Sequence, residues 1–324
     1  MVQKKDKLIT LGVDLGGTKI NVGLVDSNGK LLVVHKSLIG ASKEPEKVIN
    51  EIVSDVNVCQ NETGLDPKAI GIGAAAQVNN EGVVLGSPNL GWRNFPLKKK
   101  LEKKLGLPVL VTNDVRAATW GEWCYGVGKG VNNLVVLFVG TGVGGGVINE
   151  GSILTGCTNS GGELGHITIV SGGRKCKCPN KGCLEAYVGG WAIAERAQEA
   201  IQNLPTEGKP MLNIAGSLRL VTSVTVNIAY RQGDLLARLL LEETGRYLAA
   251  GIISIVNAFN PCLLVLGGGV IEAIPELVTI VKDIVPQMAL EAAVKNLKIV
   301  RASLGDEAAV IGAASLAKSL VTLH

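Results

Sequence analysis

One arrangement of residues occurs twice in this chain and limits the folds open to it more than any other feature. In each copy an apolar segment runs into a glycine-rich turn, which is followed by a second apolar segment, a hairpin turn and a third segment, over 7–37 and over 133–155. Short apolar segments joined by tight turns are typical of an antiparallel meander. Two copies predict a duplicated core of α/β domains rather than a solenoid, and 324 residues suffice for two domains.

Helices and further strands are expected between and after the two copies. Apolar residues recur at helical spacing over 49–56, and leucines recur at spacing four over 97–105 beside a run of lysines. We expect that run to be a solvated helix face. The other expected elements are strands at 69–75, 107–112 and 263–266 and helices at 117–125 and 234–259.

Composition and charge exclude several functional classes. The net charge of 32 − 28 = +4 is small, and only 3% of the residues are aromatic, so no nucleic-acid partner is expected. Apolar runs such as 134–139 are far shorter than the ~18–20 residues that cross a bilayer. Asp14 interrupts the first apolar run too early for a signal peptide. We therefore expect a cytoplasmic protein that has no membrane partner.

The first glycine turn, DLGGTK at 14–19, has the residues of a phosphate-binding site. Gly16 and Gly17 let the backbone approach an anion closely and take positive φ, and successive turn amides can then surround phosphate oxygens. Thr18 adds a hydroxyl and Lys19 a cation, and Asp14 is placed to order a hydrated Mg²⁺. A plain Gly-Gly hairpin explains the same residues, and this turn alone leaves both interpretations open.

The second glycine turn, GTGVGGG at 140–146, matches the dinucleotide-binding string at Gly140, Gly142 and Gly145. That fingerprint must open a helix, whereas 147–155 is expected to form a hairpin, so we reject a Rossmann interpretation. A second phosphate-binding turn that includes Thr141 and Gly144 fits better. A third glycine group, Gly267, Gly268 and Gly269, follows a predicted strand; it either lies against a nucleotide or is a simple strand-to-helix loop.

Asn113 and Asp114 follow the predicted strand at 107–112. A carboxylate in this position is well placed to act as a general base on a substrate hydroxyl. Asn and Asp are also favoured N-cap residues of a following helix, and locally that interpretation is preferred.

His166, Cys176, Cys178 and Cys183 predict a metal site. One imidazole and three thiolates suit a closed, tetrahedral Zn²⁺ with a structural role, because no position remains for a reactive water. The alternative is that these cysteines are merely buried or free. Glu163 and Glu185 flank the cluster, and with His166 they would make a receptor for a polyhydroxylated substrate; ordinary surface ion pairs are the alternative for the two glutamates.

Together these segments resemble the ROK (repressor, open reading frame, kinase) family, and within it the ATP-dependent glucokinases. The resemblance covers almost the whole chain and keeps the family's motif order. The matching segments are DLGGTK at 14–19, SPNLGW at 87–92, ND at 113–114, GTGVGGG at 140–146, ELGH at 163–166, CKCPNKGCLE at 176–185, LGGGV at 266–270 and ASLGDEAAVIGAA at 302–314.

The resemblance implies an α/β, actin-like ATPase (ribonuclease H-like) duplicated fold with two domains around a cleft. The expected domains are 1–115 plus about 308–324, and 116–307. The implied activity is transfer of a phosphoryl group from ATP to the 6-hydroxyl of a hexose, with glucose as the first candidate. The implied cofactors are Mg²⁺ and structural Zn²⁺, and the family is usually dimeric or tetrameric.

The resemblance also implies a role for each site residue. Asp114 would be the base, and the sugar would be bound by Asn89, Asn113, Asp114, Glu163, His166 and Glu185. The turns at 14–19 and 140–146 would hold the ATP phosphates, Gly267–Gly269 would meet the adenosine, and His166, Cys176, Cys178 and Cys183 would ligate zinc.

Two segments depart from the family's pattern. Residues 74–77 read AAAQ where the family often has a Pro-Gly pair that can touch the sugar, and Pro179 replaces a glycine usual after the second cysteine. Kinases for fructose, N-acetylmannosamine or N-acetylglucosamine, and polyphosphate as donor, therefore stay open, as does a non-catalytic sugar-binding protein. A sugar-responsive repressor is not expected, because only seven residues precede the first predicted strand, too few for a DNA-binding domain.

Overall fold

The computed structural model describes residues 8–322 and divides into two compact units. Unit 1 lies within 1–132, 146–162 and 302–324, and unit 2 comprises 133–145 and 163–301. The chain thus passes between the units four times. The expected domain division at 115 and about 308 stays a prediction; the compact units are cut elsewhere, because the helix that begins at Asp114 packs with unit 1.

Unit 1 is built on a five-stranded sheet of order β3-β2-β1-β4-β8. The antiparallel meander of β1, β2 and β3 is the one expected from the sequence, and β4 and β8 extend it in parallel. The three meander strands are Thr10–Leu15, Lys19–Val25 and Leu31–Leu38, and the parallel strands are Ile70–Ala74 and Val109–Asn113.

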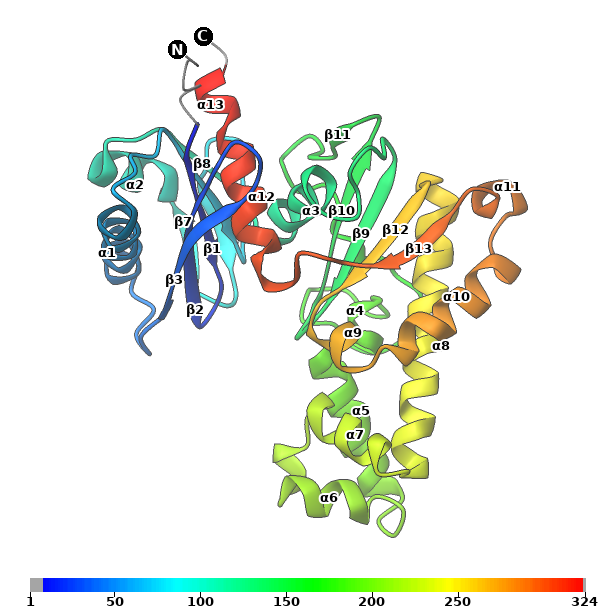
Figure 1. Cartoon of the computed structure of the whole chain (residues 1–324). Coiled ribbons are helices and arrows are strands. Elements are labelled where there is room, and N and C mark those ends of the chain that lie inside the picture. The colour runs from blue at the N-terminus through cyan, green and yellow to red at the C-terminus, as the bar shows by residue number, and fades with distance from the viewer. Residues whose placement is uncertain (1–7, 323–324) are drawn as a thin grey trace. The chain divides into compact units, whose positions relative to one another are not determined.

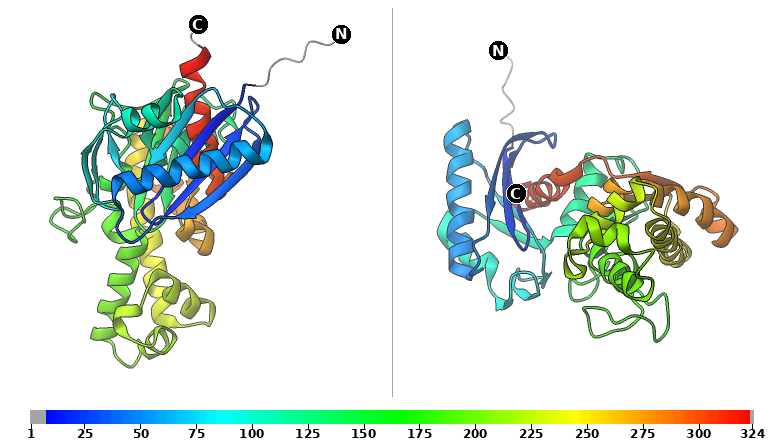
Figure 2. Two further views of the ribbon diagram at one scale, coloured as in Figure 1. Left: turned by 90° about the vertical axis from the view of Figure 1, so that its left-hand side faces the viewer. Right: turned by 90° about the horizontal axis from the view of Figure 1, so that it is seen from below.

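Helices cover both faces of this sheet (Figures 1 and 2). α1 (Pro45–Thr63) packs on β2 and β3, whereas α12 (Ala308–Ala317) packs on β1, β2 and β4. Gly12 of β1 and Gly71 of β4 make this second contact possible. A Cβ at Gly12 would lie 1.9 Å from the Val310 oxygen, and one at Gly71 would lie 1.8 Å from the Ala313 oxygen. Helix α12 therefore lies with its backbone directly against β1 and β4.

Unit 1 also contains a second, smaller sheet and several further short elements. A three-stranded antiparallel sheet consists of β5 (Gln77–Val78), β6 (Val84–Ser87) and β7 (Trp92–Phe95). The remaining elements of unit 1 are α2 (Leu97–Leu105), α3 (Asp114–Cys124), β11 (Ser152–Ile153), η3 (Gly305–Glu307) and α13 (Ser319–Thr322).

The second sheet has the order β11-β10-β9-β12-β13, which repeats the antiparallel-then-parallel plan of the first. This repetition confirms the duplicated core predicted from the sequence. Its other strands are β9 (Leu134–Val139), β10 (Val143–Asn149), β12 (Leu263–Gly267) and β13 (Lys298–Arg301). The chain leaves unit 2 for unit 1 within β10, between residues 145 and 146.

Helices make up most of the remainder of unit 2 (Figure 1). The longest is α8 (Leu235–Phe259), whose N-cap Asp234 accepts from the Ala237 amide. Within residues 8–322, no helix is both long and apolar enough to cross a membrane. The other helices of unit 2 are η1 (Leu164–His166), α4 (Glu185–Val188), α5 (Gly190–Asn203), α6 (Lys209–Ala215), η2 (Leu218–Leu220), α7 (Ser223–Arg231), α9 (Gly269–Ala273), α10 (Glu276–Met288) and α11 (Glu291–Val294).

Candidate active site

The first glycine turn joins β1 to β2 in unit 1, as expected. The Gly16 amide donates to the Lys19 oxygen at 3.1 Å, and the side chains of Thr18 and Lys19 are exposed. Neither Gly16 nor Gly17 has a positive φ, so that part of the expectation was wrong. The need for glycine at 17 is instead steric, because a Cβ there would lie 2.9 Å from the Asn89 Cβ.

Asp14 lies near the end of β1, beside this turn, and its side chain accepts a hydrogen bond from the neighbouring strand β2. The Asn21 amide group donates to Asp14 Oδ2 at 3.0 Å, across the β1–β2 register. Burial raises the pKa of Asp14, an effect that the Asn21 bond and the Lys19 charge partly oppose. A carboxylate with incomplete charge compensation beside a predicted phosphate-binding turn has the chemistry to hold a cation or its water shell.

Asn89, in the turn between β6 and β7, lies against this glycine turn. Its backbone oxygen accepts from the Lys43 ammonium at 2.7 Å, and its side chain is next to Gly17. The structure therefore brings this expected sugar-binding residue together with the first turn.

Asn113 and Asp114 lie at the junction of β8 and α3. Asn113 is the N-cap: its side-chain oxygen accepts from the Arg116 amide at 3.1 Å, and its amide group donates to the Ala76 oxygen at 3.4 Å. The N-cap interpretation is thus confirmed for Asn113. Asp114 is the first residue of α3 and is half-buried, and Gly73 of β4 gives it room. The Val115 amide donates to Asp114 Oδ1 at 2.9 Å.

Arg116, two residues beyond Asp114, fixes the loop 155–162 within unit 1. The guanidinium is buried and donates to Thr112 Oγ1, to the side-chain and backbone oxygens of Asn159, and to the Gly161 oxygen. Asn159 in turn donates to the Val78 oxygen at 2.9 Å. Sequence analysis did not single out this arginine, although it lies two residues after the predicted base.

The second glycine turn joins β9 to β10 and contacts Glu185 in unit 2. The Val143 amide donates to Glu185 Oε2 at 2.8 Å, and the Gly140 amide donates to the Gly142 oxygen at 2.9 Å. A Cβ at Gly142 would lie only 2.5 Å from Glu185 Oε2. The predicted phosphate turn and a predicted sugar-binding carboxylate are therefore in direct contact.

The segment 163–166 packs on the same turn. A Cβ at Gly165 would lie 2.0 Å from the Val143 oxygen, and one at Gly145 would lie 2.7 Å from the Leu164 side chain. Glu163 is exposed and His166 is half-buried. Unit 2 thus places Glu185 and the backbone segment that carries Glu163 and His166 against the same turn.

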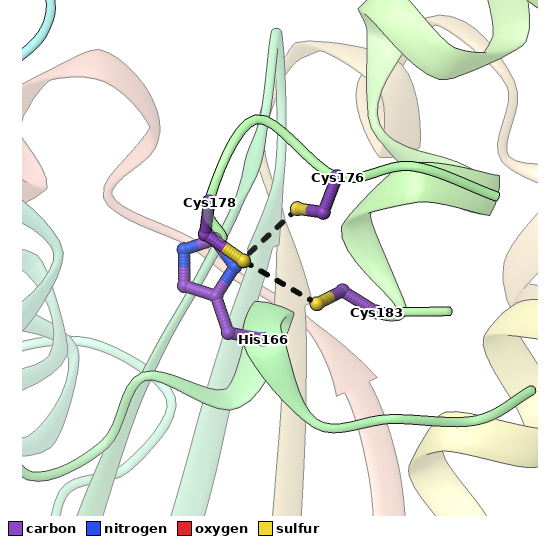
Figure 3. A group of neighbouring side chains, drawn as sticks. All are labelled: His166, Cys176, Cys178 and Cys183. Atoms are coloured by element: carbon purple, nitrogen blue, oxygen red, sulfur yellow. Dashed lines mark hydrogen bonds between the residues drawn. The ribbon is translucent and has the colours of Figure 1, made fainter. Parts of the chain in front are cut away.

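His166, Cys176, Cys178 and Cys183 converge, as predicted for a metal site (Figure 3). Their ligand atoms all lie within 4.8 Å of one another. The Cys178–Cys183 sulfur separation is 3.6 Å, and Cys176 Sγ lies 3.7 Å from His166 Nδ1. A tetrahedron with ligands about 2.3 Å from its centre has edges of about 3.8 Å. Burial raises the pKa of Cys176 to about 12, so without a cation this thiol is protonated.

The third glycine group connects β12 to α9, so it is a strand-to-helix loop. Gly267 ends the strand, Gly268 has a φ of 89°, and Gly269 begins the helix. A Cβ at Gly268 would lie 2.6 Å from the Val139 oxygen, at the end of β9 where the second turn starts. This backbone surface is therefore next to the second glycine turn in unit 2.

A comparison with family models decides which family these motifs represent. The model of the ROK family matches residues 10–320. The chain belongs to the ROK family.

Glucokinases are among the proteins that this chain resembles. The glucokinase of Streptomyces coelicolor is 34% identical over 313 residues, which cover 96% of this chain and 98% of that protein. The glucokinase of Thermotoga maritima is 34% identical over 319 residues, covering 97% and 99%.

A solved structure shows the same architecture. The ROK glucokinase of Streptomyces griseus, in complex with glucose and AMPPNP, matches with a TM-score of 0.83 and 34% identity, over 96% of this chain and 99% of that one. This likeness confirms the actin-like, two-domain α/β fold expected from the sequence.

Proposed function

We propose that this ROK protein transfers the γ-phosphoryl group of ATP to the 6-hydroxyl of a hexose, with glucose as the first substrate. The observation that carries the proposal is the likeness over almost the whole chain to a ROK glucokinase in complex with glucose and an ATP analogue. The placement of Asp114 at the start of α3 and of Glu185 against the second glycine turn supports it.

In the proposed reaction Asp114 orients the 6-hydroxyl and accepts its proton as the oxygen attacks the γ-phosphorus. The bond from that phosphorus to the bridging oxygen breaks, and ADP leaves. Phosphoryl transfer depends mainly on positioning and on charge neutralisation, and a general base contributes about 10²–10⁴-fold. Asn113 caps the helix that carries Asp114, so it keeps this carboxylate in place.

The other predicted residues divide between phosphate and sugar binding. We propose that the turns at 14–19 and 140–146 bind the ATP phosphates and Gly267–Gly269 the adenosine. The hexose hydroxyls would be bound by Asn89, Asn113, Glu163, His166 and Glu185. Mg²⁺, ordered by Asp14, would neutralise phosphate charge when bound.

We propose that the cysteine–histidine cluster (His166, Cys176, Cys178 and Cys183) holds Zn²⁺. The soft donor set and the tetrahedral spacing of the ligand atoms fit this ion. The metal would stabilise the loop 176–183 and orient His166. Nδ1 faces Cys176, which leaves Nε2 on the other side of the ring for a hydrogen bond to substrate. A homodimer or homotetramer and a cytoplasmic location stay predictions.

The decisive experiment measures ADP release with Mg-ATP and a panel of hexoses and N-acetylhexosamines. We expect turnover with glucose and at least a 10²-fold lower kcat in Asp114→Asn. Asp66→Asn, a change of the same kind at an exposed position of unit 1, serves as the matched control and keeps wild-type activity. Absence of turnover with every sugar would refute the ATP-dependent reaction, and polyphosphate would then be tested as donor.

A further inference from the structure

The carboxylate of Glu185 is held through both of its oxygens within unit 2. The Val143 amide donates to Oε2 at 2.8 Å, and the indole Nε1 of Trp191 donates to Oε1 at 3.3 Å. With one donor on each oxygen, the carboxylate is fixed in rotation as well as in position. Nothing in the motif at 176–185 indicated the second donor, which comes from the first turn of α5.

Trp191 also contacts the second glycine turn through its backbone. Its amide donates to the Thr141 oxygen at 3.2 Å, and the Gly190 amide donates to the Gly140 oxygen at 2.9 Å. One residue therefore joins the proposed phosphate turn to the proposed sugar-binding carboxylate. A phenyl side chain at 191 would keep the backbone contact and lose only the indole donor.

The face of the Trp191 ring is covered by a cation from the cysteine loop. The Lys177 ammonium lies 4.7 Å from the ring centroid, and Lys177 stands between Cys176 and Cys178. This cation–π contact links the loop of the cysteine–histidine cluster to the indole. With a cation on one face and a carboxylate at its N–H edge, this indole contacts two other protein groups that belong to the proposed site.

We propose that Trp191 is a positioning residue for the hexose, acting through Glu185, and that Lys177 ties the conformation of the cysteine loop to it. The inference rests on the proposed function, in which Glu185 accepts hydrogen bonds from hexose hydroxyls. Without the indole donor the carboxylate can rotate, so hydroxyl binding weakens in the ground state and the transition state alike. Such a loss raises KM and leaves kcat unchanged.

The test compares the kinetics of Trp191→Phe with those of the wild type. We expect the KM for glucose to rise about three- to tenfold, the size typical of losing one ordinary hydrogen bond, because the indole acts on the sugar only through Glu185; kcat and the KM for ATP should stay within about twofold. Trp123→Phe is the matched control: it removes an indole bond to the Val131 oxygen in unit 1 and leaves the KM for glucose unchanged. Lys177→Met, at an exposed position, raises that KM by about twofold.

A direct binding measurement provides the second readout. Trp191 is the only tryptophan of unit 2, because the other three, at 92, 120 and 123, belong to unit 1. Glucose added without ATP should change the tryptophan fluorescence of the wild type, and Trp191→Phe should lose most of that change. The calorimetric dissociation constant should rise in parallel with KM.

The outcomes separate this inference from the proposed function. Wild-type turnover with an unchanged KM in Trp191→Phe, or a fall in kcat at constant KM, overturns the positioning role and leaves the kinase intact. Absence of both turnover and calorimetric binding of any hexose by the wild type refutes the proposed function, and the inference with it. If Trp191→Phe fails to fold by circular dichroism, a wild-type KM in Lys177→Met overturns the coupling through the ring.

Discussion

Replacing Arg116 tests whether one buried guanidinium holds the loop 155–162 in place beside Asp114. Its two terminal nitrogens donate to four oxygens, at distances of 2.8 to 3.3 Å, and three of these acceptors belong to Asn159 and Gly161. In Arg116→Met all of them lose a charged donor. Hydrogen bonds to charged groups contribute about 1.5–3 kcal/mol each, but their effects are not additive.

The loop is only half-buried, so water can replace part of what Arg116→Met removes. We therefore expect the free energy of unfolding to fall by about 3 kcal/mol. Arg116→Lys should lose about half as much, because one ammonium cannot reach acceptors that the two guanidinium nitrogens serve separately. The kcat/KM for glucose should fall roughly tenfold, since the loop leads directly into Glu163.

Urea denaturation followed by circular dichroism measures the stability, and limited proteolysis followed by mass spectrometry measures opening of the loop. Arg246→Met is the matched control, because Arg246 is exposed and its one ion pair, with Glu242, is 3.6 Å long. We expect this control to change stability by less than about 0.5 kcal/mol. If Arg116→Met unfolds at the same urea concentration as the wild type, and its loop 155–162 is cleaved no faster by protease, the reasoning from these hydrogen bonds is refuted.

Three further predictions concern unit 2. Gly142→Ala places a Cβ 2.5 Å from Glu185 Oε2 and should lower kcat/KM for glucose about tenfold or more. Gly86→Ala is the control, because nothing lies within 4 Å of the Cβ added there, and it should leave kcat/KM unchanged. Equal kcat/KM in the two variants would refute the importance of the contact with Glu185. Zinc analysis should find about one ion per chain, and removing it with a chelator should lower the melting temperature and raise the KM for glucose; metal-free active protein would contradict the site. The hydrogen bond from Arg174 lowers the pKa of Glu199 in the folded state. The charged carboxylate therefore contributes to the free energy of unfolding above the unfolded-state pKa of about 4.3, and this contribution disappears as the pH falls through the lowered, folded-state pKa. Glu199→Gln should therefore destabilise by about 0.5 kcal/mol at pH 7, after screening by solvent, and by progressively less as the pH falls below the unfolded-state pKa; a loss that does not change with pH would contradict this.

The sequence predicted those parts of the candidate site that depend on local chemistry. The spacing of Cys176, Cys178 and Cys183 restricts them to one short loop, and His166 completes a soft donor set, so their convergence could be expected. The two glycine turns were placed correctly between strands, because alternating apolar residues and turn residues specify a meander locally.

Residues that act through long-range contacts could not be predicted from the sequence. Arg116 reaches a loop more than forty positions away, and the Asn21–Asp14 bond depends on strand register. Trp191 meets Glu185 only because α5 begins against the second glycine turn. The reason for Gly17 was also misjudged, since the close approach of Asn89 becomes visible only once β6 and β7 are in place.

By itself the sequence determined the strand pattern, its duplication and the family, because periodicity, turn residues and motif order are encoded locally. Only the tertiary structure decided which surfaces meet. Helix α12 packs on β1 and β4 because Gly12 and Gly71 leave no Cβ between the backbones, and these contacts join residues roughly 240 to 300 positions apart. Such contacts depend on how whole helices and strands pack in space, and no single segment of the sequence determines that packing.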